Sequence, residues 1–548
     1  MLTKINPLKR CALILSLGVC TPVAAQNWQH EVLFTHPSCP EQQVTSYRDP
    51  ALADTYAGLI HLNGSTSVFD FDDLPLLYLE PGEGIPTMGG GKREIIPDGV
   101  FCRSDDKELS LRRAAGTAER QSDSPYLRVF DWLATVKPQD ELFLASMSFS
   151  DNDLAKKLCT IAQQGTKVKL FIQEPRGFNS AYKTVVNCRE ADSEIAGGST
   201  TVFVNEPEAS LLEMIIYPRG KRRLAHMKTI VIKYQNQDHE PSLRSKVRYS
   251  FQSANLSSGM WAHHENWNFI TSDAEHWLAK DHLCLKDSVN KSTVADLSRL
   301  YEAIADCRDE NNINADRVLD NEIQNYFVPF SSTRGFNDKK ALRKTLFEEV
   351  ERSKKIRIAA HHLTDGKLLE QLSSKLRSGE LELDIIVDDD MFWTAHYRSD
   401  DPLIDEGGRM YYEPTDYSKS CHWGKTADQA SSCFGLFSAF EYQNIEAKLL
   451  KYGAQIRFFE ANHRNFKLFH NKIIMFEYNA PYHGYHAAVF TGAGNLSKAG
   501  FERNFENYYL VRKPEFVADF EQNYQILFNK AVKQNELPIT WDFFTTNK

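Results

Sequence analysis

Four absences narrow the class of protein to which this chain of 548 residues can belong. It has no low-complexity tract, and after residue 25 no apolar run approaches the roughly 20 residues that cross a bilayer. It has no C-x-x-C pair, which argues against the common zinc and redox motifs. It also lacks an excess of positive charge. The formal net charge of −9 argues mildly against a nucleic-acid partner without excluding one, because local patches matter more than the sum.

The composition is that of folded domains, with 42% hydrophobic and 25% charged residues, and the length allows two or three of them. Residues 1–25 are typical of a secretory signal peptide. Lys4, Lys9 and Arg10 precede the short apolar run "ALILSLGV", and small residues end at Ala25. We therefore expect cleavage after Ala25 and a secreted or periplasmic protein; a lipoprotein cysteine at Cys20 is the alternative interpretation.

Cysteine usage agrees with an oxidising compartment. Loss of the signal peptide would remove Cys11 and Cys20 and leave eight of the ten cysteines, an even number that indicates disulfides. The simplest pairing joins sequence neighbours, such as Cys284–Cys307 and Cys421–Cys433.

A long block of sequence occurs twice. Near residues 141–173 and 355–388, a β-type run is followed by a helical pattern, a glycine turn and a second β-type run. In the second copy, Thr364 and Asp365 are N-cap candidates and Gly379 is a helix stop. Such βαβ units predict parallel pairing with a right-handed crossover.

The rest of each block repeats as well. Both copies continue with an H-x-K strand, a further strand that ends in "NLS", and an apolar run that begins "EN". A block that recurs once indicates a duplication and not a solenoid. The sequence predicts an α/β fold of two similar domains with mixed β-sheets flanked by helices, related by a pseudo-twofold axis. The expected boundaries are 1–25 signal peptide, 26–119 N-terminal elaboration, 120–286 first domain, 287–329 helical linker, 330–530 second domain and 531–548 C-terminal tail.

The repeated motif carries polar residues with a common chemistry. On a strand, residues i and i+2 share a face, so the histidine and lysine of each H-x-K point the same way. Two such motifs that face each other would suit a tetrahedral phosphate: lysines and asparagine amides donate to its oxygens, one histidine attacks phosphorus, and the other protonates the leaving oxygen. A glutamate could accept from an imidazole and fix its tautomer. The candidate residues are His226, Lys228, Asn255 and Glu265 in the first copy, and His470, Lys472, Asn495 and Glu506 in the second.

A single H-x-K is ordinarily a strand end with a solvated lysine, but the ordered recurrence of the whole set favours a function. Over residues 120–530 the sequence resembles the phospholipase D superfamily, whose signature is H-x-K-x4-D, then a G-S-x-N-type turn, then N-x-E, in two copies that form one site. "HNKIIMFE", "GAGN" and "NFE" match in the second copy, and "HMKTIVIK", "QSAN" and "HHE" match in the first. The resemblance adds Ser253 as a substrate-binding residue and implies no metal and no cofactor.

The chain departs from that signature at three positions. Lys233 and Glu477 replace the aspartate of the two motifs, and Ala493 replaces the serine of the second copy. Because the family aspartate is more a structural support than a chemical participant, we expect weakened local bonding before lost chemistry. Lys233, which reverses the charge, is the more doubtful of the two replacements.

The resemblance implies phosphoryl transfer in two steps through a phosphohistidine, with His226 as nucleophile and His470 as acid. We expect a phosphodiesterase of the phospholipase D type that hydrolyses phospholipids at a membrane surface. The alternatives are a secreted nuclease, which the basic residues around each H-x-K would suit, and a degenerate scaffold that binds phosphate. The aromatic-rich insert at 388–425 could be a lid or touch a membrane, or be inert; the acidic run Asp388–Asp390 within it is an ordinary strand end more often than a metal site.

Overall fold

The computed structural model describes these parts of the chain: 28–35, 76–78, 84–86, 92–94, 100–102, 125–175, 179–190, 211–218, 223–257, 260, 263–331, 337–388, 403–404, 410–411, 449–459 and 468–531. The predicted signal peptide, nearly all of the aromatic-rich insert, the Cys421–Cys433 pair, Asp389 and Asp390 lie outside the described residues.

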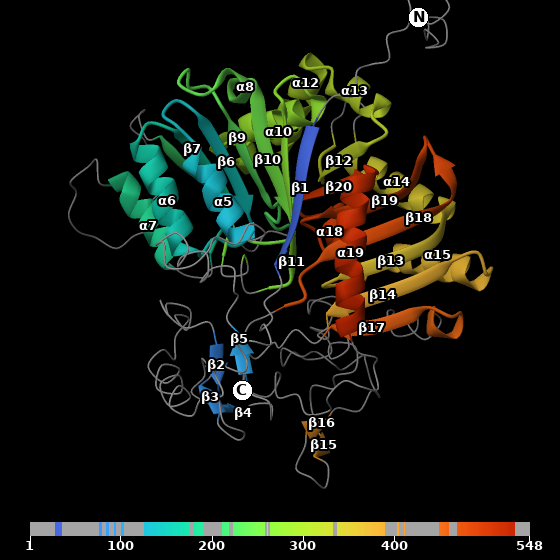
Figure 1. Cartoon of the computed structure of the whole chain (residues 1–548). Helices are drawn as coiled ribbons and strands as arrows, with labels where there is room; N and C mark the ends of the chain where they lie inside the picture. Colours follow the sequence, from blue (N-terminus) through green and yellow to red (C-terminus); the bar gives the residue numbers. More distant parts are fainter. Residues whose placement is uncertain are drawn as a thin grey trace, which may run out of the picture.

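Two mixed seven-stranded sheets form the framework, one in each half of the chain (Figure 1). The first sheet runs, in spatial order, β1 (Trp28–Thr35), β11 (Glu265–Asp273), β10 (Lys246–Gln252), β9 (Thr229–Lys233), β6 (Glu141–Ser146), β7 (Lys167–Gln173) and β8 (Leu212–Tyr217). The second runs β12 (Ile323–Val328), β20 (Glu506–Val511), β19 (Tyr485–Gly492), β18 (Lys472–Tyr482), β13 (Ser353–Ala360), β14 (Glu382–Asp388) and β17 (Gln455–Phe459). The two orders correspond strand for strand, which confirms the predicted fold class.

Helices cover the outer face of each sheet. They are α5 (Pro125–Ala134), α6 (Asn152–Gln163), α7 (Ser180–Glu190) and α8 (Pro241–Arg244) in the first half, and α14 (Asp338–Arg352), α15 (Gly366–Arg377) and α18 (Lys498–Glu502) in the second. Between the halves come α10 (Trp277–Ser288), α11 (Lys291–Ala295), α12 (Leu297–Glu310) and α13 (Ile313–Leu319), and the described chain closes with α19 (Pro514–Lys530). None of the helices in the described ranges is both long and apolar enough to cross a membrane.

Short two-stranded ladders complete the described elements. They pair β2 (Leu76–Tyr78) with β5 (Val100–Cys102), β3 (Gly84–Pro86) with β4 (Lys92–Glu94), and β15 (Leu403–Ile404) with β16 (Met410–Tyr411).

The repeated βαβ units form as the sequence predicts. β6 pairs with β7 and β13 pairs with β14, in both cases parallel, with α6 or α15 as the crossover. The side chain of Asp365 caps α15 by accepting from the backbone N–H of Leu368, and Gly379 follows the helix with φ 77°. Asp151 caps α6 in the same way. Local signals therefore determined these units in both copies.

Each sheet also gains an edge strand from outside the boundaries that the repeat defines. β1 lies within residues 26–119 and pairs antiparallel with β11, while β12 lies within 287–329 and pairs antiparallel with β20. Both edge strands occupy corresponding positions, next to the strand that begins with Glu265 or Glu506. These additions protect the edges of the strands that carry the two glutamates.

The inner faces of the two sheets pack against each other in one hydrophobic cluster. Strand alternation directs Tyr249 and Phe251 of β10, and Tyr509 and Val511 of β20, into this cluster. Tyr508 and Leu510 point instead to the outer core beneath α14 and α15. Phe251 stacks on Tyr509 with ring centroids 3.6 Å apart. Because this shared core belongs to both halves, it fixes how the two sheets face each other.

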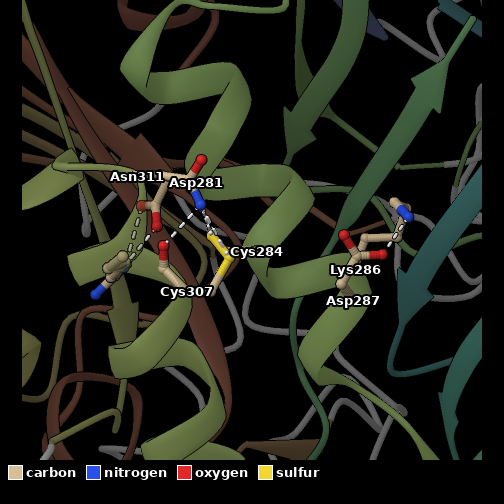
Figure 2. Close-up of a disulfide and its surroundings, with 7 residues drawn as sticks. Asp281, Cys284, Lys286, Asp287, Cys307 and Asn311 are labelled. Atoms are coloured by element: carbon tan, nitrogen blue, oxygen red, sulfur yellow. Dashed lines mark hydrogen bonds and ion pairs between the residues drawn. A yellow bond between two sulfur atoms is a disulfide. The ribbon is translucent and has the colours of Figure 1, made fainter.

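Two disulfides occur among the described residues. Cys284–Cys307 ties α10 to α12, as the neighbour-pairing interpretation predicted, and Asn311 donates from its side chain to the Cys307 carbonyl, 2.8 Å away (Figure 2). Cys159–Cys188, which we did not single out from the sequence, ties α6 to α7. Both join adjacent helices and fit folding in an oxidising compartment.

A buried ionic network joins the helices between the halves. Arg308 of α12 donates to both carboxylate oxygens of Asp281, at 2.6 and 2.9 Å, and to Asp338 at 3.0 Å. All three side chains are fully buried. Arg317 also donates to Asp338, at 2.9 Å. Charges removed from water are stable only when they are paired in this manner.

The substitution Arg308→Met is expected to destabilise the protein by about 3–5 kcal/mol, because it leaves Asp281 and Asp338 buried with fewer positive partners. The measurement is the free energy of unfolding in urea. Arg299→Met on the same helix is the matched control, since Arg299 and its partner Asp296 are exposed, and it should cost less than about 0.5 kcal/mol. Equal destabilisation by both substitutions would contradict the role of the network.

Candidate functional site

The two H-x-K motifs lie where the halves meet. His226 and Lys228 precede β9, whereas His470 precedes β18 and Lys472 begins it, so the motifs sit at strand entrances and not within long strands. Each motif hydrogen-bonds to the other half. His226 N donates to the Phe505 carbonyl and His470 N donates to the His264 carbonyl, each at 2.9 Å. Short parallel β-bridges at Ala225–Phe505 and His264–Phe469 also join the two halves here.

Each histidine is held by the glutamate of the opposite half. His226 Nδ1 lies 2.6 Å from Glu506 Oε2, and His470 Nδ1 lies 2.8 Å from Glu265 Oε1. The sequence predicted that either glutamate could orient an imidazole, and the structure crosses the two pairs between the halves. With Nδ1 engaged by a carboxylate, the Nε2 atom of each ring is the one left for a substrate.

The two lysines are buried beside these rings. Lys228 Nζ lies 3.2 Å from Nδ1 and 3.1 Å from Nε2 of His226, and it donates to the Ala493 carbonyl at 3.2 Å. Lys472 Nζ donates to the backbone carbonyl of His470. Burial lowers the pKa of Lys228 to about 8, although Glu506 and Glu265 act in the opposite direction. Burial also places the pKa of Lys472 well below its usual value.

Burial also governs the protons of the Glu–His pairs. It lowers the pKa of both His226 and His470 well below the usual value, and Lys228 and Lys472 act in the same direction. It raises the pKa of Glu506 to about 8, against the effect of Lys228. Because Glu506 and His226 are in direct contact, their titrations are coupled and belong to the pair. One histidine can then act as a base and the other as an acid.

The two glutamates are supported differently. Ser253 Oγ donates to Glu265 Oε2 at 2.5 Å and accepts from the backbone N–H of Asn266 at 2.8 Å. Its hydroxyl therefore holds a carboxylate, whereas the family resemblance had suggested contact with substrate. The corresponding residue of the second half, Ala493, cannot do this, and Asn504 instead donates to Glu506 Oε1 at 3.2 Å.

The predicted asparagines lie in matching turns, but the structure does not bond their side chains to the histidines and lysines. Asn255 and Asn495 follow β10 and β19, and their backbone carbonyls accept hydrogen bonds within the turns. The side-chain oxygens of both are buried and accept no hydrogen bond from the described residues. Their position beside the site is compatible with a role that begins when a ligand binds.

The variant positions Lys233 and Glu477 lie away from the site. Lys233 is five residues beyond Lys228, roughly 16 Å along an extended strand. In the sheets, Lys233 pairs with Glu141 and Glu477 pairs with Lys355, at corresponding positions. Each of these strand pairs therefore places opposite charges next to each other. The negative charge lies on Glu141 in the first half, whereas in the second half it lies on the H-x-K strand, at Glu477. Lys233 Nζ lies 3.9 Å from the carboxylate of Glu141, so its reversed charge has a local partner.

Two further histidines, His263 and His361, lie beside His470, and sequence reasoning missed both. The ring centroid of His361 is 5.0 Å from that of His470, and the centroid of His263 is 5.6 Å away. The sequence feature that could have identified His263 is the first histidine of "HHE", where the family motif has asparagine.

Asp388 of the acidic run accepts a hydrogen bond from the backbone N–H of Phe469 at 2.6 Å, and so supports the polypeptide before His470.

Inorganic phosphate is expected to stabilise the protein against unfolding, by about 2.7 kcal/mol at a concentration 100 times its dissociation constant. The buried lysines supply the attraction, so Lys228→Met and Lys472→Met should lose most of this increment. Lys246→Met is the control, because Lys246 pairs with Asp273 on the surface. The measurement is the change in thermal stability that phosphate causes within each variant. An equal increment in all three variants would contradict an anion site at this position.

The chain is similar to several known proteins. The family model described as cardiolipin synthase, PLD-like domain, matches residues 346–527. Among solved structures, phosphatidylserine synthase from Haemophilus influenzae is 13% identical, with a TM-score of 0.44, over 75% of this chain and 87% of its own. Nuc of Salmonella typhimurium, a phospholipase D family member, is 17% identical, with a TM-score of 0.23, over 38% of this chain and 95% of its own.

A third similar structure is the yeast tyrosyl-DNA phosphodiesterase, 10% identical with a TM-score of 0.35, over 68% of this chain and 83% of its own. No curated protein sequence matches the chain. The matched domain occupies the second half, and the first half has the same strand order and the same ordered motif. Residues 346–527 are therefore similar to a PLD-like domain, and the first half repeats the strand order of that domain.

Proposed function

We propose that the protein is a phosphodiesterase of the phospholipase D type, which hydrolyses phospholipids through a phosphohistidine. One observation carries this proposal: two histidines, each oriented by a buried glutamate of the opposite half, share a site with two buried lysines. Two imidazoles whose Nδ1 atoms are engaged by carboxylates supply a nucleophile and an acid through Nε2, and the lysines offset the charge of a phosphodiester.

In the first step, Nε2 of His226 attacks phosphorus. A P–N bond forms as the bond from phosphorus to the leaving oxygen breaks, and His470 gives its Nε2 proton to that oxygen. Glu506 stabilises the positive charge that develops on His226, and Lys228 and Lys472 stabilise the charge on the non-bridging oxygens. In this proposal, Ser253 and Asn504 act through the carboxylates and are positioning residues.

In the second step, water replaces the departed alcohol. His470 accepts a proton from the water as it attacks phosphorus, and the P–N bond breaks to regenerate neutral His226. The product is a phosphate monoester, which for a phospholipid substrate is phosphatidate. Asn255 and Asn495 are proposed to donate to phosphate oxygens from their Nδ2 atoms during both steps.

Two features support a lipid substrate. The family model that matches the second half is described by the name of a cardiolipin synthase, and cardiolipin is a phospholipid. The net charge of −9 also offers no general attraction to nucleic acid. A scaffold without turnover is less well supported, because Lys233 lies far from the rings and Ala493 contributes a backbone carbonyl to Lys228.

The activity test compares wild type with His226→Ala and His470→Ala on phosphatidylcholine or phosphatidylglycerol vesicles and on single-stranded DNA, each with and without EDTA. We expect release of the headgroup alcohol by wild type. Each substitution should lower kcat by about 10²–10⁴-fold or more, since each removes a group that acts in proton transfer or attack.

The control is His486→Ala, which removes an exposed histidine of β19 and should leave the activity unchanged. Cleavage of DNA alone would replace the lipid assignment with the nuclease. Turnover of neither substrate would favour the scaffold, and activity that disappears with EDTA would contradict the metal-free mechanism.

The rate should fall on the alkaline side of about pH 8. Lys228 has a lowered pKa of about 8, so it carries its proton below that pH and loses it above. Loss of the charge removes attraction for the phosphodiester, and log kcat/KM should then fall by about one unit per pH unit. The measurement is kcat/KM on vesicles of constant composition between pH 5 and about 10. A profile that stays flat through this range would show that Lys228 does not titrate there or does not contribute.

A further inference from the structure

The two halves of the site differ in the residues around the two rings. His263 and Asn504 occupy equivalent positions, each two residues before the glutamate that holds a histidine. His361 likewise corresponds to Met147, because each lies two residues before a bridging position, Leu363 or Phe149. The Asn504 amide contacts the glutamate that holds His226, while two imidazoles lie beside His470.

His263 has the geometry of a metal ligand. Its Nδ1 lies 3.5 Å from Glu265 Oε1, and this nitrogen is buried without a hydrogen-bond partner among the described residues. One ligand atom from each of His263, Glu265 and His470 lies within 4.8 Å of the other two. The counterpart cluster has Asn504 in place of His263, and it is the Asn504 amide nitrogen, which has no lone pair for a metal ion, that faces Glu506 and donates a hydrogen bond to it.

We propose that His263, Glu265 and His470 form a site for a divalent transition-metal ion of the zinc type, and that the bound ion inhibits the enzyme. Two imidazole nitrogens with one carboxylate oxygen are a ligand set that Zn²⁺ commonly takes, with water in the fourth position. The proposal that the metal binds depends only on the cluster itself. The proposal that the metal inhibits rests on the proposed function.

Inhibition follows from the atom that the metal occupies. His470 Nδ1 must release the proton that it shares with Glu265 before it can bind the ion, and the remaining ring proton stays on Nε2. In that form Nε2 has no lone pair for attack, and giving up its proton would leave a metal-bound imidazolate, so the ring is a far weaker acid than an imidazolium. The ion also takes the carboxylate that orients His470. Zinc would therefore block the site whichever histidine is the nucleophile.

The nearby charges set the strength of binding. Lys472 and Lys228 both lie close enough to affect the pKa of His470, and they repel a cation. Glu265, Glu506 and Asp388 act on Lys472 with the opposite sign, so acidic groups offset the lysines. We therefore expect an affinity well below that of a structural zinc site, which suits reversible inhibition.

The binding experiment uses Co²⁺ as a spectroscopic substitute for Zn²⁺ on the full mature protein, after treatment with EDTA and its removal. Visible absorption should report one bound Co²⁺ that Zn²⁺ displaces. The substitution His263→Asn, which installs the residue of the other half, should weaken Co²⁺ binding by at least about tenfold, since even outer partners of metal ligands are worth 10–100-fold. His486→Asn is the matched control and should bind as wild type does.

The activity experiment compares headgroup release with and without Zn²⁺ and expresses the result as a ratio within each protein. Zn²⁺ should inhibit wild type and His486→Asn by at least about tenfold at concentrations that saturate the Co²⁺ signal, and EDTA should restore the activity. His263→Asn should need at least about tenfold more Zn²⁺ for the same inhibition.

Unchanged Co²⁺ affinity in a folded His263→Asn protein would overturn the site, and saturation without inhibition would overturn its regulatory role. Lack of activity in every metal-free protein would instead defeat the proposed function, and the Co²⁺ measurement would still decide whether the metal site exists.

Discussion

The crossed glutamate–histidine pairs are the constraint on which the rest of the site depends. Glu506 orients His226 and Glu265 orients His470, so neither half orients its own histidine by itself. Each pair closes only because backbone bridges join the entrance of one H-x-K strand to the residue before the opposite glutamate. The shared hydrophobic core behind these bridges, with Phe251 stacked on Tyr509, keeps the two sheets in that relation.

Burial gives the site its electrostatic character. Two lysines and two glutamates have been taken out of water together, and each is tolerated because the others are present. The result is a cluster whose histidines resist protonation and whose Lys228 and Glu506 both have a pKa of about 8. A phosphodiester brings a negative charge into this cluster, and it therefore meets partners that cost no further desolvation of their own.

The duplication has left the two halves with unequal surroundings. A serine supports Glu265 while an asparagine supports Glu506, and the rings of His263 and His361 lie beside His470. Equal halves would give two interchangeable histidines, whereas the reaction proposed above assigns one as nucleophile and the other as acid. The exchanged charges at Lys233–Glu141 and Glu477–Lys355 show that the structural parts of the repeat diverged in compensated pairs. A change of charge at these positions, away from the histidine rings, is thus matched by an opposite charge on the neighbouring strand.

The sequence by itself determined the repeat, the parallel βαβ units, the Asp365 cap and the Cys284–Cys307 pair, because local periodicity, capping chemistry and short separation in the chain decide such features. It also identified both histidines and both lysines, since an ordered motif that occurs twice is visible without coordinates. Only the tertiary structure decided that each glutamate serves the opposite histidine, that Ser253 holds Glu265, and that His263 and His361 lie beside His470. Those contacts join residues from different elements, in most cases from different halves, and no local pattern records how two sheets will face each other.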